Sequence, residues 1–98
     1  MSVEARLVDK INKEWNALVL MYQQRSPLWL INNADEINSK HQIADILMCD
    51  IEELGLDVAD ITKLVHMNNV IDTVYRYCRT MIEPSYTNAV MKALGECI

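Results

Sequence analysis

Apolar residues recur every three or four positions along most of this chain, with polar and charged residues between them. This period matches the turn of an amphipathic α-helix. The first such segment predicts a helix over residues 2–25, which must end before Pro27 because proline cannot continue the helical hydrogen bonding. Its apolar positions are Val3, Leu7, Val8, Ile11, Trp15, Leu18, Val19 and Tyr22.

Residues 26–33 follow as a stretch that we expect to be non-helical, with Leu28 and Trp29 folding back onto the other helices. The sequence Ser39-Lys40-His41-Gln42 has the form of a capping box, in which the serine and glutamine side chains satisfy free amides at a helix start. It predicts a second helix over residues 39–54, ended by Gly55.

A third and longer helix is predicted over residues 57–83, beginning near Asp57 and ended by Pro84. A short fourth helix over residues 86–96 follows, capped by Ser85 or Thr87. The alternating pattern of a β-strand occurs only weakly, at residues 28–31. The predicted fold class is therefore all-α, a three-helix bundle with a short additional C-terminal helix.

The chain has 98 residues, 51% of them hydrophobic, with 9 Lys and Arg against 14 Asp and Glu, a formal charge of −5. This size indicates one domain, and the composition excludes collagenous and disordered classes. Three widely spaced cysteines, without a basic and then apolar leader, predict a reduced, intracellular protein. The longest apolar run is too short to span a bilayer.

Candidate chemistry is sparse. The cysteines and histidines fall in no metal-binding spacing, and we expect no metal site, with Cys49 and Cys78 in or near the core and His66 as a half-buried packing residue. Gly55 and Gly95 stand alone, so no phosphate-binding loop is predicted. A small bundle also leaves little room for a catalytic pocket. We therefore expect no catalytic residue, no cofactor and no enzyme activity, which leaves interaction with protein or DNA.

Three segments together resemble the MADF domain, a module related to Myb and SANT domains. They are Trp15-Asn16-Ala17-Leu18-Val19-Leu20-Met21-Tyr22, Ser26-Pro27-Leu28-Trp29 and Met67-Asn68-Asn69-Val70-Ile71-Asp72-Thr73-Val74-Tyr75-Arg76. The resemblance covers residues 10–83, and its most specific part is Pro27-Leu28-Trp29 after the first helix. It departs from the family at Ile71, where an arginine is common, and in lacking a tryptophan in the second helix.

The resemblance implies a Myb-type, helix-turn-helix-like bundle in a nuclear, chromatin-associated transcription regulator, and the chain is interpreted as one domain of that larger protein. In this family the third helix is placed to enter the DNA major groove. The residues here that match its basic surface are Lys63, Arg76 and Arg79. Because Asp57 and Asp60 would repel phosphate at the start of that helix, DNA binding is kept as the alternative function.

The preferred function is protein interaction. Several large apolar residues lie off the predicted core stripes, namely Leu20, Met21, Leu30, Ile31, Met48, Ile71, Tyr75 and Tyr77. Of these we predict that Ile71 and Tyr75, with Met67, form an exposed binding patch, which Arg76 and Arg79 border. The competing interpretation is that this face of the long helix is buried beneath the fourth helix.

The charge of −5 is unevenly distributed. Residues 35–60 carry eight acids and one base, a net charge of −7. We expect Asp50, Glu52 and Glu53 to belong to an acidic face that meets a basic partner, such as a histone tail or a basic chromatin protein. Self-association and an unrelated helical adaptor remain open alternatives.

Overall fold

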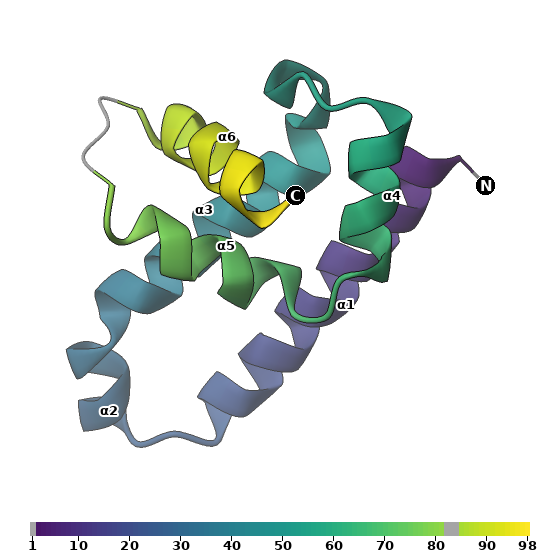
Figure 1. Cartoon of the computed structure of the whole chain (residues 1–98). Coiled ribbons are helices and arrows are strands. Elements are labelled where there is room, and N and C mark those ends of the chain that lie inside the picture. Colours follow the sequence, from purple (N-terminus) through teal and green to yellow (C-terminus); the bar gives the residue numbers. More distant parts are fainter. Residues whose placement is uncertain (1, 82–84) are drawn as a thin grey trace.

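A computed structural model of the chain describes residues 2–81 and 85–98. Within those residues the fold is all-α, as predicted, and it consists of six α-helices and one short 3₁₀ helix (Figure 1). The elements are α1 (Val3–Gln23), α2 (Pro27–Asn32), α3 (Ala34–Cys49), η1 (Ile51–Leu54), α4 (Val58–His66), α5 (Val70–Cys78) and α6 (Tyr86–Cys97).

Short polar residues start four of the helices in the way that sequence rules anticipate. The Oγ of Ser2 accepts a hydrogen bond from the amide of Ala5, and that of Ser85 accepts one from the amide of Asn88. Asp57 caps α4 in the same manner and Ser26 caps α2. The predicted first and last helices are therefore confirmed, and Ser85 rather than Thr87 is the cap of α6.

Two predicted boundaries are wrong. Residues 27–32 form the helix α2 instead of an irregular segment, because Pro27 occupies the first helical position, where its missing N–H would have no partner in any case. The following helix α3 runs from Ala34 to Cys49, so Ser39 lies inside a helix and caps nothing, and residues 51–54 form the separate 3₁₀ helix η1 instead of the end of one long helix. The first error comes from taking proline only as a helix breaker, and the second from taking Ser39-Lys40-His41-Gln42 as a capping box.

The predicted long helix over 57–83 is divided into α4 and α5 by the turn Met67–Asn68–Asn69. Asn69 has a φ of 56°, in the left-handed region that asparagine tolerates better than most residues. The helix α5 then ends at Cys78. The predicted end of the helix at residues 82–83 and its stop at Pro84 lie outside the described residues.

The helices pack in a flat arrangement with Cα extents of 41 × 32 × 19 Å. Since packed helix axes are about 8–10 Å apart, the short dimension holds only two helical layers. In Figure 1, α5 crosses α3 and lies beside α6, while α4 lies along α1. The core between them contains fully buried side chains from every long helix, including Leu7, Ile11, Ile43, Leu47, Leu64, Val74 and Leu94.

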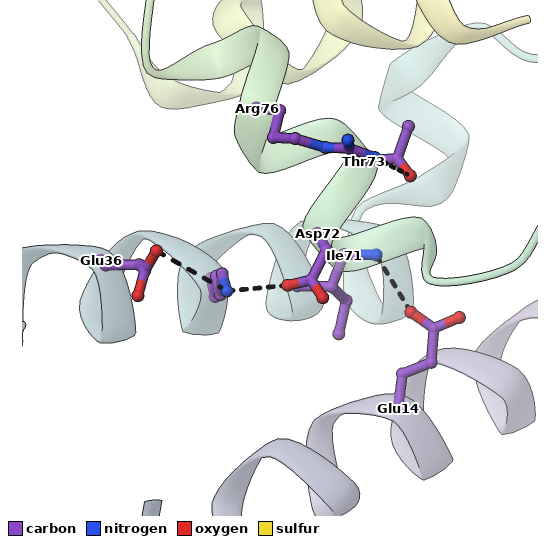
Figure 2. A network of polar contacts seen from close by, with 7 residues as sticks. Glu14, Glu36, Ile71, Asp72, Thr73 and Arg76 are labelled. Carbon is purple, nitrogen blue, oxygen red and sulfur yellow. Dashed lines mark hydrogen bonds and ion pairs between the residues drawn. The ribbon is translucent and has the colours of Figure 1, made fainter.

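The start of α5 is fixed by a residue from α1. Its N-cap residue, Asn69, makes no side-chain capping bond. Instead, the Oε1 of Glu14 accepts a hydrogen bond of 3.0 Å from the amide of Ile71, and Figure 2 shows this side chain reaching from α1 toward the first turn of α5. A carboxylate is favourable there because the N-terminal end of a helix carries partial positive charge. Glu14 thus links two elements that are 57 positions apart in sequence.

Candidate protein-interaction surface

The end of α1 and the short helix α2 expose an unusual amount of apolar surface. Leu20, Met21, Leu28 and Ile31 are 61%, 38%, 68% and 72% exposed. We call these four residues the α1–α2 surface. They are four of the seven large hydrophobic side chains that are exposed among the described residues, and the other three lie singly on α4, α5 and α6.

The exposure follows from the shape of this end. Figure 1 shows α2 at the edge of the molecule, away from α6, where it joins α1 to α3. All six residues of α2 remain at least partly exposed, since two turns of helix present only one side to their neighbours. That side carries Trp29, whose ring lies 5.9 Å from the ring of Tyr22 and 5.0 Å from the guanidinium carbon of Arg25. Leu28, which we expected to fold back, points away from the core.

An apolar hollow of about 380 Å³ lies between α1, α2 and α3. Its floor includes Trp15, which packs against His41 with ring centroids 5.0 Å apart. The residues that line it are Trp15, Leu30, Ala34, Ile37, Asn38 and His41. Hollows lined mainly by apolar side chains with a few polar groups are typical of sites that receive a ligand or a partner side chain.

Charge is nearly absent from the same part of the chain. Between Trp15 and Ala34 the sequence contains no acidic residue, and Arg25 is the one residue that is charged at neutral pH. The rest of the chain therefore carries a net charge of −6, against −5 for the whole chain. Depletion of charge with exposed leucine, isoleucine and methionine is the composition of an interface centre, whereas ordinary surface is richer in lysine and glutamate.

The predicted binding patch on the third helix is wrong at its centre. Ile71 is only 1% exposed, and Met67 and Tyr75 are half-buried. The turn at Asn69 gives α5 a direction of its own, and its apolar side then packs against α6, α3 and α1. The competing interpretation, that this face lies beneath the last helix, is the one that the structure supports.

The three acidic candidates lie at the other end of α3 from α2. Asp50 follows the last residue of α3 and is half-buried, while Glu52 and Glu53 are exposed on η1. A 16-residue helix is about 24 Å long, so the acidic residues and the α1–α2 surface do not form one patch.

The three basic candidates are exposed but separated. Arg76, on α5, and Arg79, at its C-terminal cap, line one polar pocket with Lys40. Lys63, on α4, lines a different hollow beside Met91 and Ile98 of the C-terminal region. The structure therefore brings Arg76 and Arg79 together and leaves Lys63 apart from them.

A buried lysine, which the capping-box interpretation overlooked, connects α3 to α5. The ammonium of Lys40 lies 2.7 Å from Asp72 and 3.9 Å from Glu36, and 5.3 Å from the centre of the Tyr75 ring. Figure 2 shows the labelled carboxylates of Glu36, on α3, and Asp72, on α5, on neighbouring helices, and Lys40 forms its two ion pairs with them. The available sequence signal was that Lys40 is the one base among residues 35–60, where eight acids surround it.

The electrostatic balance at Lys40 favours its charged form. Burial by itself would lower the pKa of Lys40, but the hydrogen bond and negative charge of Asp72, with smaller contributions from Tyr22 and Glu36, outweigh it and raise the pKa above its ordinary value of 10.5. Burial raises the pKa of the neighbouring Tyr22 above 10.0, which the positive charge of Lys40 partly opposes. At neutral pH Lys40 is thus charged, and it forms a structural ion pair with Asp72.

The remaining reactive groups form no catalytic constellation among the described residues. Cys49 is exposed and His66 is exposed, contrary to expectation, and Cys78 is buried as expected. Burial raises the pKa of the Cys78 thiol to about 11, so it is protonated and unreactive at neutral pH. Among residues 2–81 and 85–98 no group of three or more His, Cys, Asp or Glu side chains is arranged to hold a metal ion.

No protein-family model, curated protein or solved structure matches this chain. In the described part of the chain, no helix combines the length and the apolar character needed to cross a membrane.

Proposed function

We propose that this chain is a protein-interaction domain that binds its partner through the α1–α2 surface. The observation that carries the proposal is that Leu20, Met21, Leu28 and Ile31 are all exposed within residues 15–34, a stretch in which Arg25 is the one charged residue. Singly exposed apolar residues are ordinary, but several of them on α2 and the end of α1, with an apolar hollow lined by Leu30 of the same short helix, favour a binding site.

The test is affinity capture from cells that express the tagged chain, comparing Leu28→Glu with Val58→Glu. Both residues lie in the first turn of a helix, at 68% and 63% exposure, where a glutamate suits the helix end. Proteins bound by the wild type should be lost with Leu28→Glu and kept with Val58→Glu, both folded by circular dichroism. Equal capture by all three, or a wild type that captures neither another protein nor an untagged copy of this chain, contradicts the proposal.

A second candidate function, DNA binding, is favoured by the geometry of α4 and α5. A three-residue turn with a left-handed residue, Asn69, joins two short helices, which is the form of a helix-turn-helix unit. The second helix exposes Arg76 and Tyr77, with Arg79 at its cap. In this proposal α5 is the helix that faces DNA, as the MADF resemblance implies.

Titration of a short DNA duplex, followed by fluorescence anisotropy at increasing salt, tests this candidate. Binding should be detectable at low salt and weaken as salt rises. The double variant Arg76→Gln/Arg79→Gln should reduce the slope of that dependence by about one for each phosphate that the arginines no longer neutralise. Arg6→Gln, an exposed arginine on α1 and outside α4 and α5, is the matched control. Unchanged anisotropy at low salt rules the candidate out.

The acidic residues suggest a further contact of the same domain. We propose that Asp50, Glu52 and Glu53 attract a basic segment, such as a histone tail, in a nuclear chromatin-associated protein of the kind that the MADF resemblance implies. Neutralising all three to asparagine and glutamine should weaken binding to a basic histone peptide and flatten its salt dependence. Identical isotherms for variant and wild type would remove these residues from the interface.

A further inference from the structure

We infer that the partner at the α1–α2 surface is a second copy of this chain, bound in a two-fold symmetric dimer with the two α2 helices antiparallel. The inference rests on the proposed function, because it names the occupant of the same surface. Three observations carry it: the shape of this end, its charge, and the order of charges along it.

This end carries both protruding apolar side chains and a recess. In a two-fold interface the same patch serves both copies, so it must contain both a protrusion and a recess to receive it. Leu28 and Ile31 protrude from α2 at 68% and 72% exposure. The apolar hollow beside Leu30 of the same helix, with Trp15 and Ile37 in its lining, is large enough at about 380 Å³ to receive such side chains.

The charge of the molecule favours pairing at this end. Outside residues 15–34 the chain carries a net −6, so most other ways of bringing two copies together would oppose like charges. At the α1–α2 end this repulsion is lowest. A standard interface covers about 800 Å² of each partner, about an eighth of the 6093 Å² surface of this chain. Residues 15–34 make up about a fifth of the chain, and more than half of them are exposed.

The order of the charges that flank α2 sets the orientation. Arg25 precedes the N-terminal end of α2 and Asp35 follows its C-terminal end, and both are exposed. When two such helices lie antiparallel, Arg25 of one copy comes next to Asp35 of the partner subunit, and the reverse pair forms by symmetry. A parallel arrangement would bring the two arginines together instead. Opposite charges at the rim of an apolar centre fix register in this way.

Sedimentation equilibrium over a range of protein concentrations tests the inference. The wild type and Val58→Glu should both dimerise, and Leu28→Glu should raise the dissociation constant at least about tenfold, the effect of disrupting one central anchor of an interface. Asp35→Asn should weaken the dimer, because it removes the carboxylate that faces Arg25 in the antiparallel arrangement, whereas in a parallel arrangement it would relieve repulsion between two Asp35 carboxylates. Unchanged or tighter association of Asp35→Asn would overturn the antiparallel arrangement.

A wild-type chain that stays monomeric at every concentration would overturn the dimer. The proposed function is tested separately, by affinity capture. If capture of another protein is still lost with Leu28→Glu, the surface binds a different partner and only the dimer is wrong. If Leu28→Glu changes neither sedimentation nor capture, both the dimer and the proposed function are wrong.

Discussion

The helices α2 and α5 are both short and amphipathic, yet one lies on the surface and the other lies inside the fold. All six residues of α2 are at least partly exposed, whereas α5 buries Val70, Ile71, Val74 and Cys78 between α1, α3 and α6. The difference is clearest between two isoleucines: Ile31 is 72% exposed and Ile71 is 1% exposed. Apolar character alone therefore does not distinguish a core position from a binding position in this chain.

The two helices also differ in how they start. A residue next to α2 caps it, since Ser26 accepts the amide of Trp29. The cap of α5 comes from Glu14, far away in sequence. A helix that a neighbouring residue caps can form at the edge of the molecule. A helix whose cap comes from a distant segment must pack against that segment. This contrast explains why the apolar side chains of α2 are available to a partner, whereas the apolar side of α5 is not.

Substituting the two isoleucines by alanine gives the largest expected contrast. Ile71→Ala removes buried methyl groups and should lower the free energy of unfolding by about 2–5 kcal/mol. Ile31→Ala should change it by no more than about 0.5 kcal/mol. Urea denaturation followed by circular dichroism measures both. Similar losses for the two variants would mean that α2 is as deeply packed as α5.

Removal of the buried ammonium should have the next largest effect. Lys40→Met keeps the apolar stem but leaves Asp72 without its partner, and because Asp72 is 44% exposed and can be hydrated, the loss should be about 1–3 kcal/mol. The pH dependence identifies the cause. Since the pKa of Lys40 is raised, its stabilisation is complete below pH 10.5 and declines as pH rises through the higher folded value.

The measurement is the free energy of unfolding of wild type and Lys40→Met from neutral pH to above pH 10.5. The raised pKa of Tyr22 also makes stability change above pH 10.0, and because Lys40 lowers that pKa the two proteins differ in it, so both are compared in a Tyr22→Phe background. The wild type should therefore lose its advantage over the variant as Lys40 loses its proton. A difference between them that is constant with pH would show that packing, rather than the ion pair, is responsible.

The sequence was sufficient to predict the class of the fold and three of the four helices whose caps are local, but not α2, which Ser26 caps. Ser2, Asp57 and Ser85 begin helices where the pattern placed them, and Gly55, at a φ of 68°, ends η1 as expected of a left-handed cap. The division at Asn69 was not predicted because the apolar period continues across it. The one local sign of a turn there is the pair Asn68-Asn69, and asparagine indicates a left-handed turn position less strongly than glycine does.

The location of the candidate site was harder to predict than its composition. Leu20, Met21 and Ile31 were recognised as apolar residues off the core stripes, and all three are exposed. Ile71 satisfied the same criterion and is buried. What separates them is the packing of α5 on α1, α3 and α6, an association of distant segments that no local pattern encodes. Leu28 was missed because a helix starting at Pro27 was not expected.

Glu14, which caps α5 from the distant helix α1, allows a smaller test of the difference between α2 and α5. Glu14→Ala removes the carboxylate that accepts the amide of Ile71, and should lower the free energy of unfolding by about 1 kcal/mol, as loss of a helix cap does. Glu14→Gln keeps an acceptor oxygen and should lose less. Hydrogen exchange of the first amides of α5 should accelerate in Glu14→Ala. If those amides exchange as in the wild type, the helix is held by packing alone.

The smallest expected effect lies at the exposed end. The guanidinium of Arg25 lies 5.0 Å from the centre of the Trp29 ring, an exposed cation–π interaction worth about 0.5–1 kcal/mol. Arg25→Lys should retain part of it, and Arg25→Gln should remove it while leaving α5 and the core unaffected. Because this interaction holds α2 against the end of α1, its removal should also increase hydrogen exchange in α2 more than in α5. Equal acceleration in both helices would mean that α2 unfolds together with the core, and the distinction between the two regions would fail.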